Sequence, residues 1–253
     1  MTHLGRRLVA LHLVALLVLV ATAWSVKVVS LQQGVGRVRA YWSVPHGPPG
    51  GLLYVALGDS CAQGVAASRP DRGYVGLLAG RHEAAAKRPV QVTNLNVSGA
   101  RMRGVLAHQL PALRVVRPDL VRVATDGHDI CSYDGARLAR QVDRLTATRP
   151  DETFIADAPP SCGRCEGHAQ QAADAVQRSS KRHGLPVVAL HLALCREGWP
   201  AMLTKFAADW FGPNDRGYRV RADTFWARIS SSPAGRAARL RPTLATTATA
   251  PAA

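Results

Sequence analysis

The feature that most constrains the fold of this chain is a regular alternation of two kinds of segment between residues 51 and 229. Short apolar runs of strand length alternate with longer amphipathic stretches of helix length. The expected strands are LLYVAL, VQVTNLNV, DLVRVAT, ETFIAD and PVVALH, and the expected helices lie around residues 73–87, 101–113, 134–148, 165–183 and 214–229. Strands that alternate with helices pair in parallel through right-handed crossovers. The pattern therefore predicts a three-layer α/β fold, with a parallel sheet of about five strands and helices on both faces.

The segments outside this alternation differ from it in composition. Residues 1–29 contain a nearly uninterrupted apolar run, Leu8 to Val26, which follows two arginines and is long enough to span a bilayer. Residues 30–50 are polar and then rich in Pro and Gly, as is typical of a linker. Residues 230–253 are rich in Ala, Thr and Pro, and we expect them to be disordered. The sequence thus predicts a signal-anchor or transmembrane segment, a linker, one folded domain over 51–229 and a disordered tail.

The apolar run has three interpretations. An uncleaved anchor makes the chain a single-pass membrane protein with an extracytoplasmic domain, and we favour this localisation. The small residues Ala21, Thr22 and Ala23 resemble a signal-peptide cleavage site, so secretion after cleavage is the alternative. The third interpretation is a buried hydrophobic helix of a soluble protein.

The charge balance is strongly basic, with 32 Lys and Arg against 17 Asp and Glu and a formal net charge of +15. An excess of this kind is compatible with an anionic partner such as nucleic acid or lipid headgroups. The basic residues are mostly Arg scattered among Ala, however, without the interleaved aromatic residues on which bases stack. We therefore expect no nucleic-acid partner.

The five cysteines are Cys61, Cys131, Cys162, Cys165 and Cys195. Outside the cytoplasm they are able to oxidise, but the sequence does not reveal their pairing. Cys61 and Cys131 adjoin the loops of the expected site, so a disulfide between them is conceivable. Cys162, Cys165 and His168 resemble the start of a zinc site, yet no second CxxC follows. A disulfide or thiols are favoured over zinc, and no metal or cofactor is expected.

The chemistry is expected at the carboxyl ends of the strands, where ligands bind in open parallel sheets. In YVALGDSCAQG, a glycine turn places Ser60 between a buried strand and the next segment. Unpaired N–H groups at a helix start stabilise a developing oxyanion there. Taken alone, a serine after a Gly-Asp turn is equally often a helix cap.

Four motifs occur together and in order: GDSCAQG, NLNVSGARM, TDGHDI and DWFGPNDRGY. Over residues 52–229 this set resembles the SGNH, or GDSL, hydrolase family. The resemblance implies a flavodoxin-like sheet and ester hydrolysis, with Ser60 as nucleophile and the N–H groups of Ser60 and Gly99 as oxyanion donors. The third block of the family normally supplies an asparagine side chain as a further donor. This chain has His128 at that position.

The fourth block departs from the family in the proton acceptor. The family pattern is DxxHP, in which the aspartate orients a histidine that deprotonates the serine. Here Asp209 and Pro213 match the pattern, and Gly212 replaces the histidine. Loss of that base from a Ser-His-Asp system costs about four to six orders of magnitude in turnover. A glycine cannot take or return a proton.

Three accounts of this departure remain open. In the first, His128 acts as a surrogate base with Asp126 or Asp129 holding its tautomer. In the second, the protein is a weak or inactive homologue that keeps a binding cleft. In the third, another histidine such as His168 or His191 supplies the base.

The sequence therefore predicts an ester hydrolase that acts through an acyl-serine intermediate on a small acyl ester. The alternative is an inactive binding module of the same fold for a cell-surface glycan or lipid ester. Asn214 is expected to cap the last helix. Three further histidines stand in polar or helix-end contexts and are expected at the surface, namely His82, His108 and His183.

Overall fold

The computed structural model describes residues 3–125, 127–130, 133–148, 152–160, 165–196, 198, 204–207 and 212–232. Its centre is a five-stranded sheet in the order β2-β1-β3-β4-β5, in which every neighbouring pair is parallel. The strands are β1 (Leu52–Gly58), β2 (Val90–Asn94), β3 (Leu120–Ala124), β4 (Thr153–Ala156) and β5 (Val187–Val188). This order is that of flavodoxin-like sheets, so the predicted fold is confirmed.

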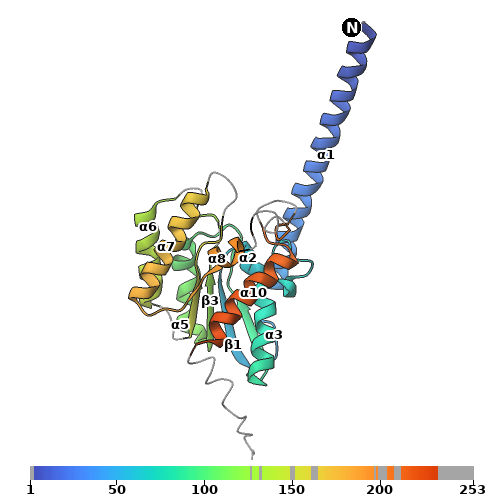
Figure 1. The fold of residues 1–253 in the computed structure, drawn as a ribbon. Helices are drawn as coiled ribbons and strands as arrows, with labels where there is room; N and C mark the ends of the chain where they lie inside the picture. Colours follow the sequence, from blue (N-terminus) through green and yellow to red (C-terminus); the bar gives the residue numbers. More distant parts are fainter. Residues whose placement is uncertain are drawn as a thin grey trace, which may run out of the picture.

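Helices cover both faces of the sheet (Figure 1). One face is covered by α3 (Tyr74–Ala86) and α10 (Asp215–Ser230), and the other by α6 (Gly135–Thr148) and α7 (Glu166–Arg182). On the first face the rings of Tyr74 and Phe225 stack with their centroids 5.3 Å apart. On the second, Val142 and Leu145 are fully buried against the sheet. Burial of apolar side chains on both faces is the main stabilising contribution to such a sheet.

Two predicted elements differ from those observed. The helix expected over 101–113 is broken into α4 (Met102–Gly104), a π-helical turn η2 (Val105–Gln109), a 3-10 turn η3 (Leu110–Ala112) and α5 (Leu113–Val116). Pro111 lies in this segment, and a proline removes a backbone donor and crowds the preceding turn. The strand expected in PVVALH is only two residues long, because the chain turns at Ala189 into α8 (Leu190–Cys195).

The N-terminal helix α1 (His3–Tyr41) projects far from the body of the molecule (Figure 1). Its last turns are attached by the buried Val38 and by Trp42, whose Nε1 donates to the Gln63 carbonyl over 2.8 Å. The helix includes the first part of the expected linker, 30–50. Among the described residues, no helix combines the length and apolarity that a membrane crossing requires. The transmembrane segment and signal predicted from the sequence are therefore not supported.

The expected disordered tail lies almost wholly outside the described residues, because the structure describes the chain only to residue 232. Within the tail's first residues, α10 ends at Ser230. The division of the chain into segments stays a prediction.

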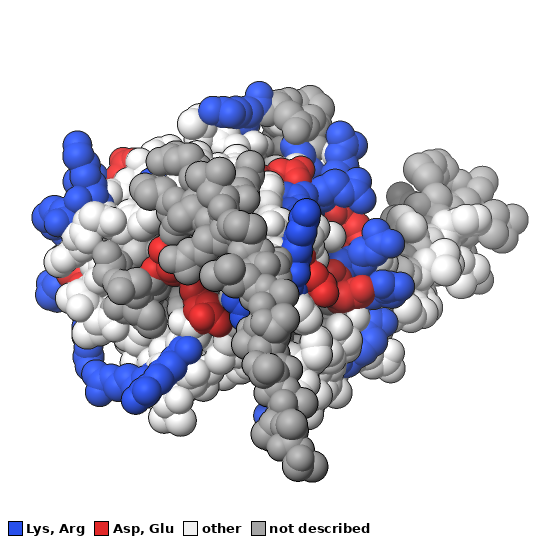
Figure 2. Space-filling view, turned by 90° about the horizontal axis from the view of Figure 1, so that it is seen from below, with Lys and Arg blue, Asp and Glu red and all other residues white. Residues whose placement is uncertain are grey.

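Basic and acidic side chains are mixed on the face of the molecule seen in Figure 2. Lys and Arg lie there in several separate groups, with Asp and Glu between them. On this face the excess positive charge does not form one continuous stripe.

A buried arginine lies in the middle of the sheet. Arg122 of β3 is fully buried, with its guanidinium carbon 4.6 Å from the centre of the Phe154 ring and its Nη2 3.1 Å from His82 Nε2. Burial lowers the pKa of Arg122 to about 10. Burial, and then the neighbouring guanidinium, lower the pKa of His82 to about 3. The prediction that His82 lies at the surface is wrong, because its helix turns this side chain toward the sheet.

The depressed pKa of His82 predicts a loss of stability in mild acid. The unfolded chain binds a proton below about pH 6.5, whereas the folded chain excludes it down to about pH 3. The contribution is therefore complete above pH 6.5 and is lost as the pH falls. Urea unfolding should show that His82→Gln removes about 1–2 kcal/mol of the stability difference between pH 7 and pH 5. The exposed His108→Gln should leave that difference unchanged. An equal difference in all three proteins would contradict the assignment.

Candidate active site

The candidate nucleophile follows the central strand directly. β1 ends at Gly58, and Ser60 is the first residue of the short helix α2 (Ser60–Gln63). Asp59 caps this helix by accepting a hydrogen bond from Cys61 N over 3.0 Å. Ser60 itself is half-buried, and within the described part of the chain no side chain is hydrogen-bonded to its hydroxyl.

Gly58 lets the end of β1 lie unusually close to β3. Its φ of +150° is in the region that favours glycine, and the sheet register pairs it with Ala124. A Cβ at this position would lie 1.9 Å from the Ala124 carbonyl oxygen. The side chain of Gln109 closes the other side, since it donates to the Gly58 carbonyl and accepts from the Gly58 N–H, both over 2.8 Å. Gly58, two residues before the candidate nucleophile Ser60, is therefore held on two sides.

The loop after β2 is hydrogen-bonded to α2 through Gln63, the last residue of that helix. Ser98 Oγ donates to Gln63 Oε1 over 2.6 Å, and Gln63 Nε2 donates to the Asn96 carbonyl over 2.7 Å. Gly99 is exposed and has a φ of +81°. In the described residues, neither the Ser60 N–H nor the Gly99 N–H donates a hydrogen bond. Two unpaired donors beside a serine hydroxyl are what an oxyanion hole requires.

His128 lies in the loop after β3, the strand next to β1. Gly127 has a φ of +51°, and His128 follows it, half-buried, in a turn closed by a 3.1 Å hydrogen bond from Ile130 N to the Gly127 carbonyl. Asp129 accepts a 2.7 Å hydrogen bond from Met102 N and so ties this turn to α4. Asp126, the other proposed partner of His128, lies outside the described residues.

The fourth block is only partly described, and Asp209 lies outside the described residues. Gly212 is buried, and its carbonyl accepts a 2.8 Å hydrogen bond from Ala207 N. Asn214 caps α10, as predicted, by accepting from the N–H groups of Arg216 and Gly217. Position 212 is therefore held in a folded segment, but it carries no side chain that accepts a proton.

This segment is docked on the loop that follows the nucleophile. Asp215 accepts hydrogen bonds from the Ser68 N–H over 2.7 Å and from the Ser68 hydroxyl over 2.6 Å. The Tyr218 hydroxyl donates to the Val65 carbonyl over 2.6 Å. The first and fourth blocks thus lie together although they are far apart in the sequence.

A second polar group occupies the ends of β4 and β5. The buried carboxylate of Asp157 accepts from His191 N over 2.9 Å and from Gln177 Nε2 over 2.7 Å. Burial raises the pKa of this carboxyl, and the two donors oppose the shift. His191 is itself buried, with Nδ1 3.3 Å from the Ala158 carbonyl and Nε2 3.4 Å from Glu166. Sequence reasoning missed both Asp157, which it included in the expected strand ETFIAD, and Glu166.

The residues of the CGRCEGH motif that were considered for zinc are only partly described. Cys162 lies outside the described residues, and the exposed ring of His168 stacks on Tyr133 at 5.3 Å. Among described side chains, the group with metal-ligand geometry is Glu166, His191 and Cys195. Cys61 is buried, Cys165 is half-buried and Cys195 is exposed. Cys131 lies outside the described residues, so the conceivable Cys61–Cys131 disulfide stays a prediction.

Comparison with known proteins identifies the family. The model of the GDSL-like lipase/acylhydrolase family matches residues 56–220. The chain belongs to this family. No curated protein matches it. Family membership confirms the resemblance seen in the sequence motifs; the roles of the individual site residues stay predictions.

Solved structures of the same fold include several esterases. A lipase/acylhydrolase from Enterococcus faecalis has a TM-score of 0.58 at 18% identity, with 73% of this chain and 96% of that chain covered. TesA has a TM-score of 0.58 at 21% identity, covering 70% and 97%. Axe2, an acetylxylan esterase from Geobacillus stearothermophilus, has a TM-score of 0.56 at 18% identity, covering 71% and 94%. At these identities the likeness shows the fold alone.

The contact at Gly58 predicts a large effect of a single methyl group. Gly58→Ala places a Cβ against the Ala124 carbonyl, and β1 must shift to relieve the overlap. We expect a loss of about 3 kcal/mol in the free energy of unfolding by urea. Gly80→Ala is the matched control, because Gly80 lies in α3 with no atom within 4 Å of an added Cβ. That change should stabilise by about 0.5–1 kcal/mol. Equal stability of the two variants would show that β1 tolerates the methyl group.

Proposed function

We propose that this protein hydrolyses a small acyl ester through an acyl-serine intermediate on Ser60. The observation that carries the proposal is that the N–H groups of Ser60 and Gly99 donate no hydrogen bond among the described residues, and that their two loops are joined by the Ser98–Gln63 hydrogen bond. Family membership supports ester substrates, since the matching model is that of lipases and acylhydrolases. The acetylxylan esterase activity named for Axe2 makes sugar O-acetyl groups the first substrates to try.

The reaction consists of two acyl transfers. Ser60 Oγ attacks the ester carbonyl carbon, its proton passes to a base, and the carbonyl oxygen becomes an oxyanion bound by the two N–H groups. The base then protonates the departing alcohol, which leaves an ester of Ser60. Water, deprotonated by the same base, attacks this ester and releases the acid. Ser60 then recovers its proton.

The proposed base is His128. The register pairs Gly58 of β1 with Ala124 of β3, so Ser60 and His128 leave the sheet on adjacent strands at the same level. His191 faces the Ala158 carbonyl and Glu166, and His168 stacks on Tyr133, which orients both rings by other contacts. Because His128 also stands where the family has its asparagine donor, its use as a base leaves the oxyanion with two donors. We therefore expect slow turnover.

A second candidate function is binding without turnover. The observation that favours it is the buried glycine at position 212, whose carbonyl accepts a hydrogen bond from Ala207 N. In this alternative, the loops around Ser60 bind a cell-surface glycan or lipid ester and leave it unchanged.

Hydrolysis of a short chromogenic acyl ester by the full chain tests the proposal. We expect slow release of the chromophore by the wild type and none by Ser60→Ala. His128→Ala should reduce turnover by about 10²–10⁴-fold, the usual contribution of a general base. The matched control is His108→Ala, since His108 is exposed on η2 and should not affect turnover.

Gly212→His separates the two candidates. If the wild type is inactive and this variant is active, the protein is a binding module that lacks only the base. If His128→Ala retains full turnover while Ser60→Ala is inactive, the base is another group. Turnover that persists in Ser60→Ala would rule out the acyl-serine scheme.

The localisation outside the cytoplasm is a further part of the proposal. Its support is the apolar run after Arg6 and Arg7, because large side chains from Leu11 to Val26 are more than half exposed on α1. Apolar surface of this extent is unfavourable in water. Protease added to intact cells should remove a C-terminal epitope tag. Removal only after lysis would contradict this localisation.

A further inference from the structure

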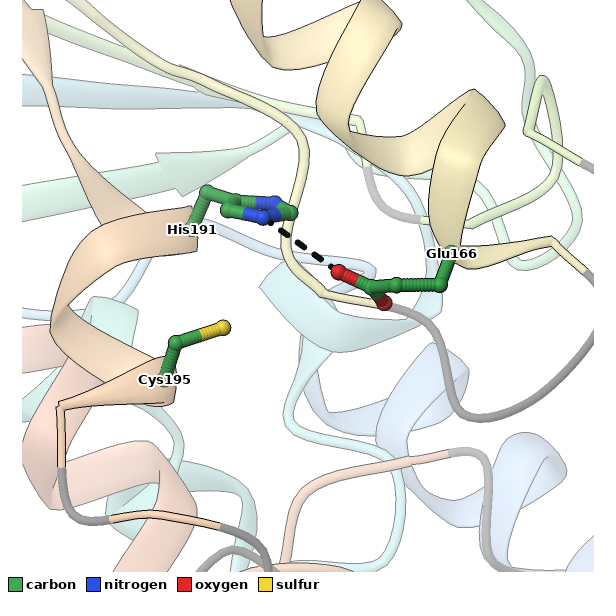
Figure 3. Close-up of side chains that lie close together, drawn as sticks. All are labelled: Glu166, His191 and Cys195. Atoms are coloured by element: carbon green, nitrogen blue, oxygen red, sulfur yellow. Dashed lines mark ion pairs between the residues drawn. The ribbon is translucent and has the colours of Figure 1, made fainter.

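A histidine, a carboxylate and a thiol meet beside the end of β5. Glu166 is the first residue of α7, whereas His191 and Cys195 lie four residues apart on α8 and so share one face of that helix. The ligand atoms of the three side chains lie within 4.8 Å of one another (Figure 3). The side chains of His191 and Glu166 point toward each other, and the Cys195 sulfur points into the space beside them.

The ring of His191 is oriented in the way that metal-binding imidazoles usually are. Its Nδ1 lies 3.3 Å from the Ala158 carbonyl, which only accepts hydrogen bonds, so Nδ1 carries a proton. A second contact fixes the backbone, because His191 N donates to the buried Asp157 carboxylate. A backbone carbonyl on one ring nitrogen fixes the tautomer and leaves the other nitrogen as a ligand. That other nitrogen, Nε2, faces Glu166.

His191 Nε2 and Glu166 Oε1 lie 3.4 Å apart, a distance that suits either a shared proton or a metal ion between them. A proton on Nε2 is sufficient to join His191 and Glu166. The sulfur of Cys195 lies within 4.8 Å of both atoms and completes a set of nitrogen, oxygen and sulfur ligands, which favours a metal ion.

The spacing of the three groups fits a tetrahedral transition-metal ion. Ligand atoms bound to zinc at about 2.0–2.3 Å lie roughly 3.3–3.8 Å apart. The Nε2 and Oε1 atoms are already at 3.4 Å. Side chains of Glu166 and Cys195 are partly or largely exposed, so small rotations bring the sulfur to the same distance, whereas the 10% exposed His191 side chain stays fixed.

We propose that Glu166, His191 and Cys195 bind a divalent ion of the zinc class, with a fourth position open to water or to an exogenous ligand. Three protein ligands with an open position are typical of reactive rather than purely structural zinc sites. The bound ion would join the start of α7 to α8 at the same edge of the sheet as Ser60. This site is independent of ester hydrolysis.

Cobalt(II) is the probe, because a thiolate ligand produces a charge-transfer absorption and tetrahedral coordination produces intense visible bands. The full chain, treated with a chelator and then freed of it, should bind one equivalent of cobalt with both features, and zinc should displace it. Cys195→Ser should abolish the charge-transfer band. Glu166→Gln should retain this band and weaken cobalt binding at least about tenfold. Both substitutions are at exposed or half-exposed positions, and circular dichroism checks that the variants fold.

Two matched controls test the assignment of the ligands. Cys165→Ser and His168→Asn change a neighbouring thiol and imidazole of the CGRCEGH motif and should leave the cobalt spectrum unchanged. Loss of the charge-transfer band in Cys165→Ser, with retention in Cys195→Ser, would overturn the proposal. Failure of the wild type to bind one equivalent would also overturn it. Ser60→Ala should bind cobalt normally, which separates this result from that of the esterase assay.

Discussion

The close contact between the end of β1 and β3 is the constraint on which the candidate site depends. Only glycine fits at position 58, because a Cβ would overlap the Ala124 carbonyl, and Gln109 occupies both backbone groups on the opposite side. With β1 held in this register, the chain leaves the sheet at one defined point. Ser60 therefore begins α2 beside the loops that follow β2 and β3. The proposed nucleophile Ser60, Gly99 and His128 thus follow three neighbouring strands.

The proposed site combines backbone groups that suit an esterase with side chains that differ from the family pattern expected from the motifs. The N–H groups of Ser60 and Gly99 remain unpaired in the described structure, and α10 still docks on the loop after α2 through Asp215. In contrast, Gly212 has no side chain to act as a base, and we expect His128 at the position of the family's amide donor. Preorganised N–H groups stabilise an oxyanion without proton transfer, so a weakened enzyme and a binding module share the same scaffold.

Polar groups also gather after the carboxyl ends of β4 and β5, at the same edge of the sheet as Ser60. Asp157, buried and hydrogen-bonded to the backbone of His191, holds the start of α8 in place. The Ala158 carbonyl then sets the orientation of the ring, which directs Nε2 toward Glu166. The same contacts explain why β5 is short, since the chain turns into a helix where these hydrogen bonds form. Because these contacts orient the His191 ring toward Glu166, we do not propose His191 as the base for Ser60.

The sequence by itself determined the fold class, the order of strands and helices, the family and the cap at Asn214, because these depend on local periodicity and on motifs of consecutive residues. It placed the boundaries of α3, α6, α7 and α10 within one or two residues. It was wrong about the helix over 101–113, the length of β5 and the exposure of His82, whose outcomes depend on contacts with distant segments. Only the tertiary structure decided that Gln109 holds Gly58, that Asp215 meets Ser68, and that Glu166 meets His191. Such pairs follow from the order of the strands within the sheet and from their register, and the spacing of residues along the chain indicates neither.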